Sequence, residues 1–193
     1  MRYQSSYDSF VAVAARQLSA SYTAIAASGR GVLRNFDGEG YNDTLPALYD
    51  RIMPRERAQV PQVDAKRSAD AVILQLGTND FVAGVPDAAA FNDAYAALLT
   101  RIHARHPRAL LVMVVGPMLD DRYPQPRART LMKRWLTQLA SRMRATTPGL
   151  RIDVLELGMQ DGEPRGCDDH PGPQTHQRLG EELATYLGQR LRR

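Results

Sequence analysis

Residues 166–176, GCDDHPGPQTH, bring a thiol, two carboxylates and two histidines together within eleven positions. A histidine can act as a general base when a partner, commonly a carboxylate, holds its second ring nitrogen and so fixes the tautomer. Asp168 lies two residues before His170, and Pro171 stiffens the chain directly after it. The stretch is therefore a candidate for half of a catalytic triad, whereas we expect His176 to make a structural hydrogen bond.

The same stretch has two other interpretations, a metal site and a polar loop. Its carboxylates and histidines, Asp169 included, lack any familiar metal-ligand spacing. Cys167 is the only cysteine of the chain, which excludes an intrachain disulfide and a four-cysteine zinc site. The residue types and their spacing therefore disfavour a metal site.

A second candidate lies at residues 74–81, LQLGTNDF, where polar residues directly follow an apolar run. An asparagine amide at the tip of a strand can donate a hydrogen bond to a developing oxyanion without adding a charge. Asn79 is therefore a candidate oxyanion donor. Asp80 could instead order the loop by accepting hydrogen bonds from backbone N–H groups, and a plain polar turn is the alternative to both roles.

A third candidate is the pair Gly29 and Gly31, which follows the apolar run at 22–28. Glycine permits backbone turns that bulkier residues resist, and it leaves the N–H open to a ligand. By itself the pattern is also typical of a simple tight turn.

The elements that must position these junctions alternate between apolar runs and helical patterns, which is typical of a parallel α/β sheet. The predicted strands are residues 22–28, 70–76, 109–115 and 151–157. The predicted helices are residues 9–18, 87–105 with Asp87 as N-cap, 127–145 and 174–191. The segment 29–69 is predicted to be a long loop with a short helix near 45–52. In open α/β sheets, the loops at the carboxyl ends of the strands hold the functional site.

The length of 193 residues predicts a single domain, residues 1–193, that can bury a sizeable core. The net charge of +4 comes from arginines scattered among acidic residues, with no basic stripe, so we expect no binding to nucleic acid. No apolar stretch approaches the length of a membrane span, so we expect no membrane partner either.

Taken together, the three junctions resemble the sequence blocks of the SGNH (GDSL-type) hydrolases. The SG at 28–29 resembles the second block of that family, GTND at 77–80 the third, and CDDHP at 167–171 the last. The stretches SGRGVLRN, LGTNDF and the later THQ are most similar to the second carbohydrate esterase family, acetyl esterases that act on acetylated plant polysaccharides. The resemblance implies a three-layer, flavodoxin-like α/β fold with a parallel sheet.

Carried over to this chain, the resemblance makes His170 the catalytic base and Asp168 its orienting partner, a role that a backbone carbonyl takes in some members. Gly29, through its N–H, and Asn79, through its side chain, would form the oxyanion hole together with the N–H of the nucleophile. Gly31 replaces Gly29 if the second block aligns one turn later. The resemblance implies no metal and no organic cofactor.

The chain departs from the family at its nucleophile. SGNH enzymes carry a serine in a G-D-S block at the tip of the first strand, and no G-D-S occurs in this sequence. Ser5, Ser6 and Ser9 precede or open the first helix and are predicted to be cap or surface hydroxyls, so none is nominated as the nucleophile. Because the first strand is central in a flavodoxin-like sheet, we expect this chain to be the C-terminal part of a longer enzyme, with the first strand missing.

The sequence therefore predicts an SGNH-type serine esterase, a carbohydrate O-deacetylase similar to acetyl xylan esterases, whose nucleophile lies upstream of residue 1. The expected partner is an acetylated carbohydrate or another small ester. Asp169 stands where the family commonly has an aromatic residue that could stack on sugar, so the carbohydrate preference stays open. The alternative is a catalytically inactive remnant or a carbohydrate-binding domain of the same fold. Relatives of this type are often exported, which makes a secreted or periplasmic full-length form the expectation.

A nucleotide- or nucleic-acid-binding α/β module is a further alternative. It would need a glycine-rich phosphate loop between a strand and a helix, and GRG at 29–31 is too short for that.

Overall fold

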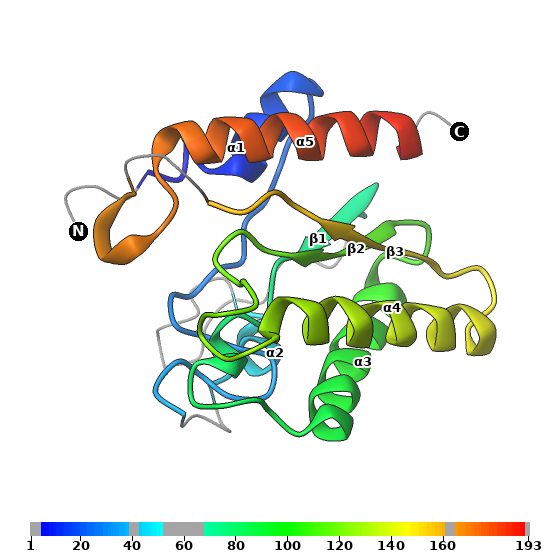
Figure 1. The fold of residues 1–193 in the computed structure, drawn as a ribbon. Coiled ribbons are helices and arrows are strands. Elements are labelled where there is room, and N and C mark those ends of the chain that lie inside the picture. Colours follow the sequence, from blue (N-terminus) through cyan, green and yellow to red (C-terminus); the bar gives the residue numbers. More distant parts are fainter. Residues whose placement is uncertain (1–4, 39–42, 52–67, 161–164, 192–193) are drawn as a thin grey trace. The chain divides into compact units, whose positions relative to one another are not determined.

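Figure 1 shows the computed structural model of the chain, which describes residues 5–38, 43–51, 68–160 and 165–191. The chain divides into two compact units. The first unit comprises residues 1–24, 116–118 and 157–193, and the second comprises residues 25–115 and 119–156. That residues 1–193 act as one domain stays a prediction.

A three-stranded parallel sheet forms the core of the second unit. Strand β2 (Leu110–Val115) lies between β1 (Ala71–Leu74) and β3 (Arg151–Glu156), and both neighbours run parallel to it. Every residue of β2 is buried, as expected for the central strand of a covered sheet. The parallel α/β class and the three strands predicted after residue 69 are therefore confirmed.

Two long helices, α3 (Ala88–Arg105) and α4 (Ala128–Thr146), lie on one face of this sheet in Figure 1. Helix α3 begins at Asp87, whose carboxylate accepts a hydrogen bond from the N–H of Ala90 at 2.8 Å. Such a cap satisfies one of the backbone donors that the first turn of a helix leaves without a partner. Both helices and the Asp87 cap agree with the prediction from sequence.

An aromatic cluster joins these helices to the turn that follows β1. This turn is the 3₁₀ helix η1 (Asn79–Phe81), and Phe81 is fully buried. The ring centroid of Phe81 lies 5.5 Å from that of Trp135 on α4 and 6.2 Å from that of Phe91 on α3. Aromatic pairs at this separation stabilise beyond the area that they bury. Phe81 therefore anchors η1 to the hydrophobic core.

The strand predicted at 22–28 is wrong. Residues 21–27 adopt no regular secondary structure, and Tyr22 is 46% exposed. A strand needs a neighbour that pairs its backbone N–H and C=O groups. Among the described residues, the sheet contains only β1, β2 and β3, and none of these strands pairs with the segment.

The long loop predicted over 29–69 is described in part. Its short helix α2 (Leu45–Leu48) follows Thr44 and has Pro46 in its first turn, a position that proline tolerates well. The helix is shorter than the predicted 45–52, and Ile52 lies outside the described residues.

Helices α1 (Phe10–Gln17) and α5 (Pro173–Leu191) pack against each other in the first unit. Ser9 caps α1, since its Oγ accepts a hydrogen bond from the N–H of Ala12 at 3.4 Å. Gly180 permits the close approach of the two helices, because an added Cβ would lie 2.5 Å from the Cβ of Val13. Both helices were predicted from sequence and are confirmed.

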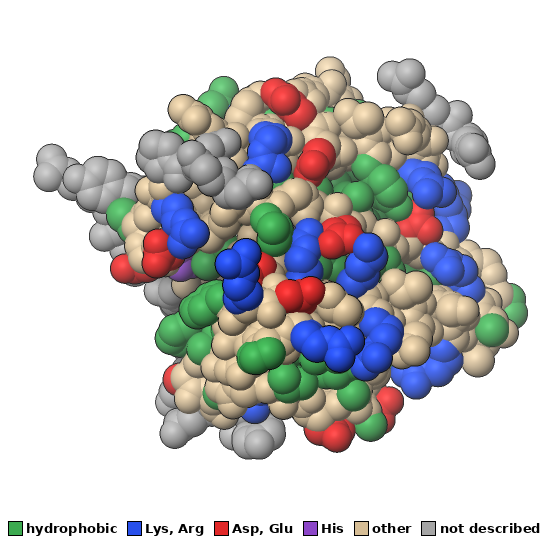
Figure 2. All heavy atoms as spheres, viewed as in Figure 1, with side chains coloured by type: hydrophobic (Ala, Val, Ile, Leu, Met, Phe, Trp, Pro, Cys, Tyr) green, Lys and Arg blue, Asp and Glu red, His purple; other side chains and the backbone are tan. Residues whose placement is uncertain are grey.

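Charged side chains of opposite sign are mixed on the face that Figure 2 shows. On the second unit, Arg129 and Lys133 of α4 both contact the carboxylate of Glu156, at 2.9 and 2.5 Å. Lys133 is the more exposed of the two cations, and an exposed ion pair of this kind contributes about 0–1 kcal/mol. None of the helices in the described ranges combines the length and apolarity that crossing a membrane requires.

Candidate active site

The loop before α5 carries the predicted base. Residues Cys167–Asp169 form a short 3₁₀ turn, η2, in which Asp168 and Asp169 have φ values of 53° and 58°. A positive φ is uncommon for residues other than glycine, although Asp and Asn tolerate it better than most. The N–H of Gly166 donates to the C=O of His170 at 2.7 Å and closes the loop.

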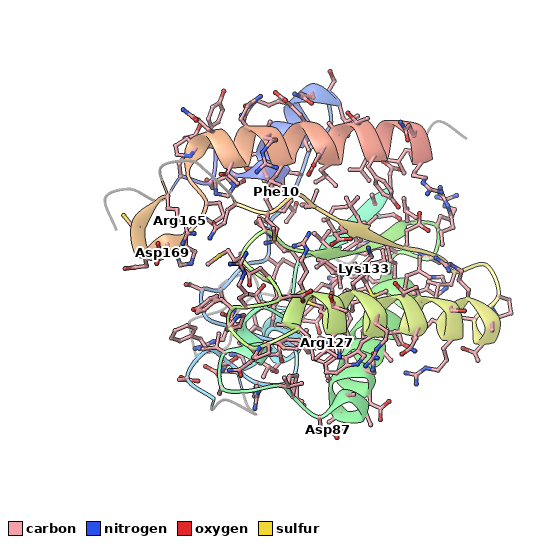
Figure 3. The ribbon with its side chains drawn as sticks, in the orientation of Figure 1. Phe10, Asp87, Arg127, Lys133, Arg165 and Asp169 are labelled. Atoms are coloured by element: carbon pink, nitrogen blue, oxygen red, sulfur yellow. The ribbon has the colours of Figure 1, made fainter. Side chains whose placement is uncertain are left out.

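Two side chains outside this turn hold it in place. Nε2 of Gln160 donates to the main-chain oxygen of Asp169 at 2.9 Å. The guanidinium of Arg165 pairs with the Asp169 carboxylate at 3.2 Å, and Figure 3 shows the two side chains in the same loop. The side chain of Asp169 is thus engaged in an exposed ion pair.

The ring of His170 is oriented by main-chain carbonyls. Its Nδ1 lies 3.0 Å from the oxygen of Cys167 and 3.1 Å from the main-chain oxygen of Asp168. With its proton on Nδ1, the ring donates to these oxygens, and Nε2 keeps the lone pair that a general base needs. The structure therefore brings Asp168 and His170 together, with the main-chain oxygen of Asp168 in contact with the ring.

His176 makes the structural hydrogen bond that the sequence predicted. Its Nδ1 accepts from the N–H of Phe10 at 3.3 Å, and the two rings stack with centroids 6.4 Å apart. Burial lowers the pKa of His176, the nearby Asp8 raises it, and His170 adds to the lowering. Because the ring accepts through Nδ1, the neutral form is the one that fits the folded unit.

This arrangement predicts a pH dependence of stability. A histidine whose pKa is lower in the folded than in the unfolded state stabilises the fold above its unfolded pKa, near 6.5, and this contribution is lost as the pH falls below that value. The wild-type chain should therefore lose more stability than His176→Gln between about pH 7.5 and about pH 5.5. Urea unfolding followed by circular dichroism measures the free energy of unfolding of both proteins across this pH range. An equal change of this free energy with pH in both proteins would show that His176 does not contribute.

In the second unit, Asn79 contacts the glycine loop that follows residue 28. Its Nδ2 donates to the main-chain oxygen of Arg30 at 3.0 Å. Gly29 has a φ of +77°, which suits glycine, and its C=O accepts from the N–H of Phe36 at 2.8 Å. The structure thus brings the two predicted oxyanion residues onto segments that are bonded to each other.

Asp80 orders this loop, as the sequence analysis offered as an alternative. The carboxylate is fully buried and accepts from the N–H groups of Val32 at 2.9 Å, Leu33 at 2.7 Å and Arg34 at 3.0 Å. Burial raises the pKa of Asp80, and the three backbone donors oppose that shift.

The substitute for Gly29 in the sequence analysis, Gly31, already uses its N–H. That group donates to Oδ1 of Asn35 at 3.3 Å, and Asn35 is itself buried. An added Cβ at Gly31 would lie 2.5 Å from Oδ2 of Asp80. Gly31 therefore serves the close packing of the loop, and this favours Gly29 as the oxyanion donor.

The N-terminal serines act locally. The Oγ of Ser5 accepts from the N–H of Asp8 at 3.2 Å, and that of Ser9 donates to the C=O of Ser6 at 2.8 Å besides capping α1. Within the described ranges, no group of three His, Cys, Asp or Glu side chains gathers in a way that could hold a metal ion.

Comparison with known proteins matches residues 2–178 to the GDSL-like lipase/acylhydrolase family. The chain belongs to this family. The resemblance inferred from the three junctions is therefore confirmed, and the matched range includes all three of them.

Two curated relatives of this GDSL-like chain are esterases. It is 31% identical over 196 residues to the cellulase/esterase CelE of Acetivibrio thermocellus, covering 97% of this chain and 22% of CelE. It is 26% identical over 189 residues to an acetylxylan esterase/glucomannan deacetylase of Cellvibrio japonicus, covering 97% of this chain and 49% of that protein. The chain thus spans half or less of the length of these relatives.

Solved structures confirm the α/β SGNH-hydrolase fold. A family two carbohydrate esterase from Clostridium thermocellum, determined in complex with cellohexaose, matches with a TM-score of 0.89 and 29% identity. The match covers 98% of this chain and 56% of that one. A family two carbohydrate esterase from Cellvibrio japonicus matches with a TM-score of 0.86 and 24% identity, which supports the fold alone.

Sequence reasoning missed three residues that support the site in this GDSL-like chain. They are Arg34, whose Nε donates to the main-chain oxygen of Asp80 at 2.7 Å, the buried Asn35, and Gln160. Each acts on a residue distant in sequence or on a loop backbone, so no local spacing marked them. For Arg34 and Asn35 the available signal was their place after the glycines in SGRGVLRN, whereas Gln160 lies outside that stretch.

Proposed function

We propose that this protein is an SGNH-type serine esterase that removes acetyl groups from carbohydrate. The observation that carries the proposal is the orientation of His170, whose Nδ1 lies within hydrogen-bond distance of two main-chain carbonyls. Because these oxygens only accept, they favour the tautomer with the proton on Nδ1, in which Nε2 keeps its lone pair. Membership of the GDSL-like family and two esterase relatives support it.

The proposed chemistry is acyl transfer through a serine. The serine oxygen attacks the acetyl carbonyl carbon while Nε2 of His170 takes the hydroxyl proton. The N–H of Gly29 and the amide of Asn79 donate to the oxyanion that forms. The C–O bond to the sugar then breaks, and the sugar oxygen leaves with the proton from His170. Water, deprotonated by Nε2 of His170, then attacks the acetyl carbonyl of the acetyl-enzyme. The bond between the acyl carbon and the serine oxygen breaks, His170 returns the proton to that oxygen, and acetate leaves.

The nucleophile is proposed to lie outside residues 1–193, because no G-D-S block occurs in the sequence, Ser9 caps α1 and the Oγ of Ser5 makes a local hydrogen bond. The roles of Gly29, Asn79, Asp168 and His170 are proposals as well. The sugar to which the acetyl group is attached is proposed from the relatives, one of which is an acetylxylan esterase/glucomannan deacetylase.

The direct test compares two forms of the protein. One is this chain, and the other carries an added N-terminal strand and G-D-S block. Acetate release from acetylated xylo-oligosaccharide and from an aryl acetate should occur with the extended form and not with this chain alone. Equal activity in both would contradict the external nucleophile. No activity in either, with retained binding of the oligosaccharide, would favour a carbohydrate-binding domain of the same fold.

A further inference from the structure

Asp80 is a fully buried carboxylate that the proposed reaction does not use. It follows Asn79 directly on η1, and its oxygens point into the turn formed by residues 32–34. Oδ2 accepts from Val32, and Oδ1 accepts from Leu33 and Arg34. Successive backbone N–H groups that converge in this way form a concave anion-binding nest. A side chain of the same unit, 46 to 48 residues away in sequence, therefore fills this nest.

Two further hydrogen bonds connect the glycine loop, residues 29–35, with η1. Nε of Arg34 donates to the main-chain oxygen of Asp80 at 2.7 Å. Nδ2 of Asn79 donates to the main-chain oxygen of Arg30 at 3.0 Å. The absence of a side chain at Gly31 leaves room for the Asp80 carboxylate. We call this set of interactions the Asp80 clamp: the three hydrogen bonds to the Asp80 carboxylate and the two bonds made by Arg34 Nε and Asn79 Nδ2.

We propose that Asp80 is a positioning residue, which fixes the N–H of Gly29 and the amide of Asn79 relative to each other as a pair of oxyanion donors. This inference rests on the proposed esterase function. Oxyanion donors act only when they are preorganised, and a displacement of about 1 Å at a reacting centre can cost about a hundredfold in rate. The clamp joins the segments that carry the two donors. Among the described side chains, only that of Asp80 accepts hydrogen bonds from all three backbone N–H groups of residues 32–34.

A carboxylate is required because every partner of the side chain is a donor. In Asp80→Asn one oxygen becomes an NH₂ group, which would face a backbone N–H that also needs an acceptor. A buried donor without an acceptor is unfavourable, so the loop should shift to satisfy it. Asp87→Asn is the matched control on the same unit, because Asp87 caps α3 and asparagine is an equally good N-cap.

The first test follows the clamp itself by amide hydrogen exchange of this chain. In Asp80→Asn the amides of residues 32–34 should exchange at least about tenfold faster, while those of β2 keep their protection. Asp87→Asn should leave residues 32–34 unchanged. Unchanged exchange in Asp80→Asn would overturn the clamp, and this result does not depend on esterase activity.

The second test measures kcat and KM for acetate release, in the N-terminally extended form of the protein described above. Asp80→Asn should lower kcat about tenfold or more and change KM by less than about threefold, because oxyanion donors act in the transition state. In the Asn79→Ala background the same substitution should cost much less, since one donor that Asp80 positions is already absent. A merely structural role would give the same loss in both backgrounds and would overturn the proposal. If the wild type releases no acetate in any form, the proposed function and the catalytic role of Asp80 both fail, whereas the exchange result stands separately.

Discussion

Replacing His170 by alanine should lower the turnover of acetylated substrate by about 10²–10⁴-fold in the active form of the enzyme, with little change in KM. General base catalysis by a positioned side chain contributes a factor of this size. The structure supports this role because two main-chain oxygens, those of Cys167 and Asp168, hold Nδ1 at 3.0 and 3.1 Å. The measurement is the initial rate of acetate release at saturating substrate, with circular dichroism of each variant to verify folding.

Asp168→Asn is the matched comparison, and it asks which part of Asp168 matters. The residue has a φ of 53°, and asparagine tolerates that conformation as aspartate does, so the loop should keep its shape. If the main-chain oxygen orients His170, the substitution should cost less than about tenfold in kcat. A loss as large as that of His170→Ala would instead identify the carboxylate as the partner. Near-normal turnover of His170→Ala would refute the assignment of the base.

The elements that depend on local pattern were predictable from the sequence. Helix α3 shows both signals together, an amphipathic repeat and a capping aspartate at Asp87, and it begins where these signals place it. Strand β2 was predictable because a continuous apolar run fits a strand that is covered on both faces. The run at 22–28, YTAIAAS, is richer in alanine and hydroxyl residues, and no described strand pairs with it. Strand formation depends on pairing with a neighbour, which the composition of the segment does not reveal.

The sequence predicted which residues are candidates for the site, at three junctions. It predicted fewer of the contacts that these residues make. Asn79 could be recognised from its place after a strand, whereas its bond to Arg30 spans 49 residues of sequence. The carboxylate of Asp80 had two possible roles until its partners at residues 32–34 were known. For His170 the sequence offered the Asp168 carboxylate as the partner, or a backbone carbonyl as in some family members, and the structure places two main-chain oxygens within reach of Nδ1. Contacts of this kind depend on the tertiary fold or on backbone conformation, and residue spacing specifies neither.

Replacing Asn79 by alanine should lower turnover about a hundredfold or more. Removing one oxyanion donor typically costs about 2.7–4 kcal/mol of transition-state stabilisation. The ground state should be less affected, so kcat falls while KM stays within about threefold. The substitution also removes the hydrogen bond from Nδ2 to the main-chain oxygen of Arg30, and a bond of this type contributes about 1 kcal/mol to stability.

Asn92→Ala separates the catalytic loss from this structural one. Asn92 lies on α3 of the same unit, and its Nδ2 donates to the main-chain oxygen of Ala88 at 2.7 Å. Both variants thus lose an amide and one bond to a backbone carbonyl. Asn92→Ala also removes a buried amide oxygen that has no hydrogen-bond partner and places a better helix former on α3, so it should lower the urea midpoint less than Asn79→Ala does. Only Asn79→Ala should lower kcat on an aryl acetate. If Asn79→Ala turned this substrate over at a near-normal rate, the amide would have no part in holding the oxyanion, because an aryl acetate passes through the same tetrahedral intermediate without any sugar contact.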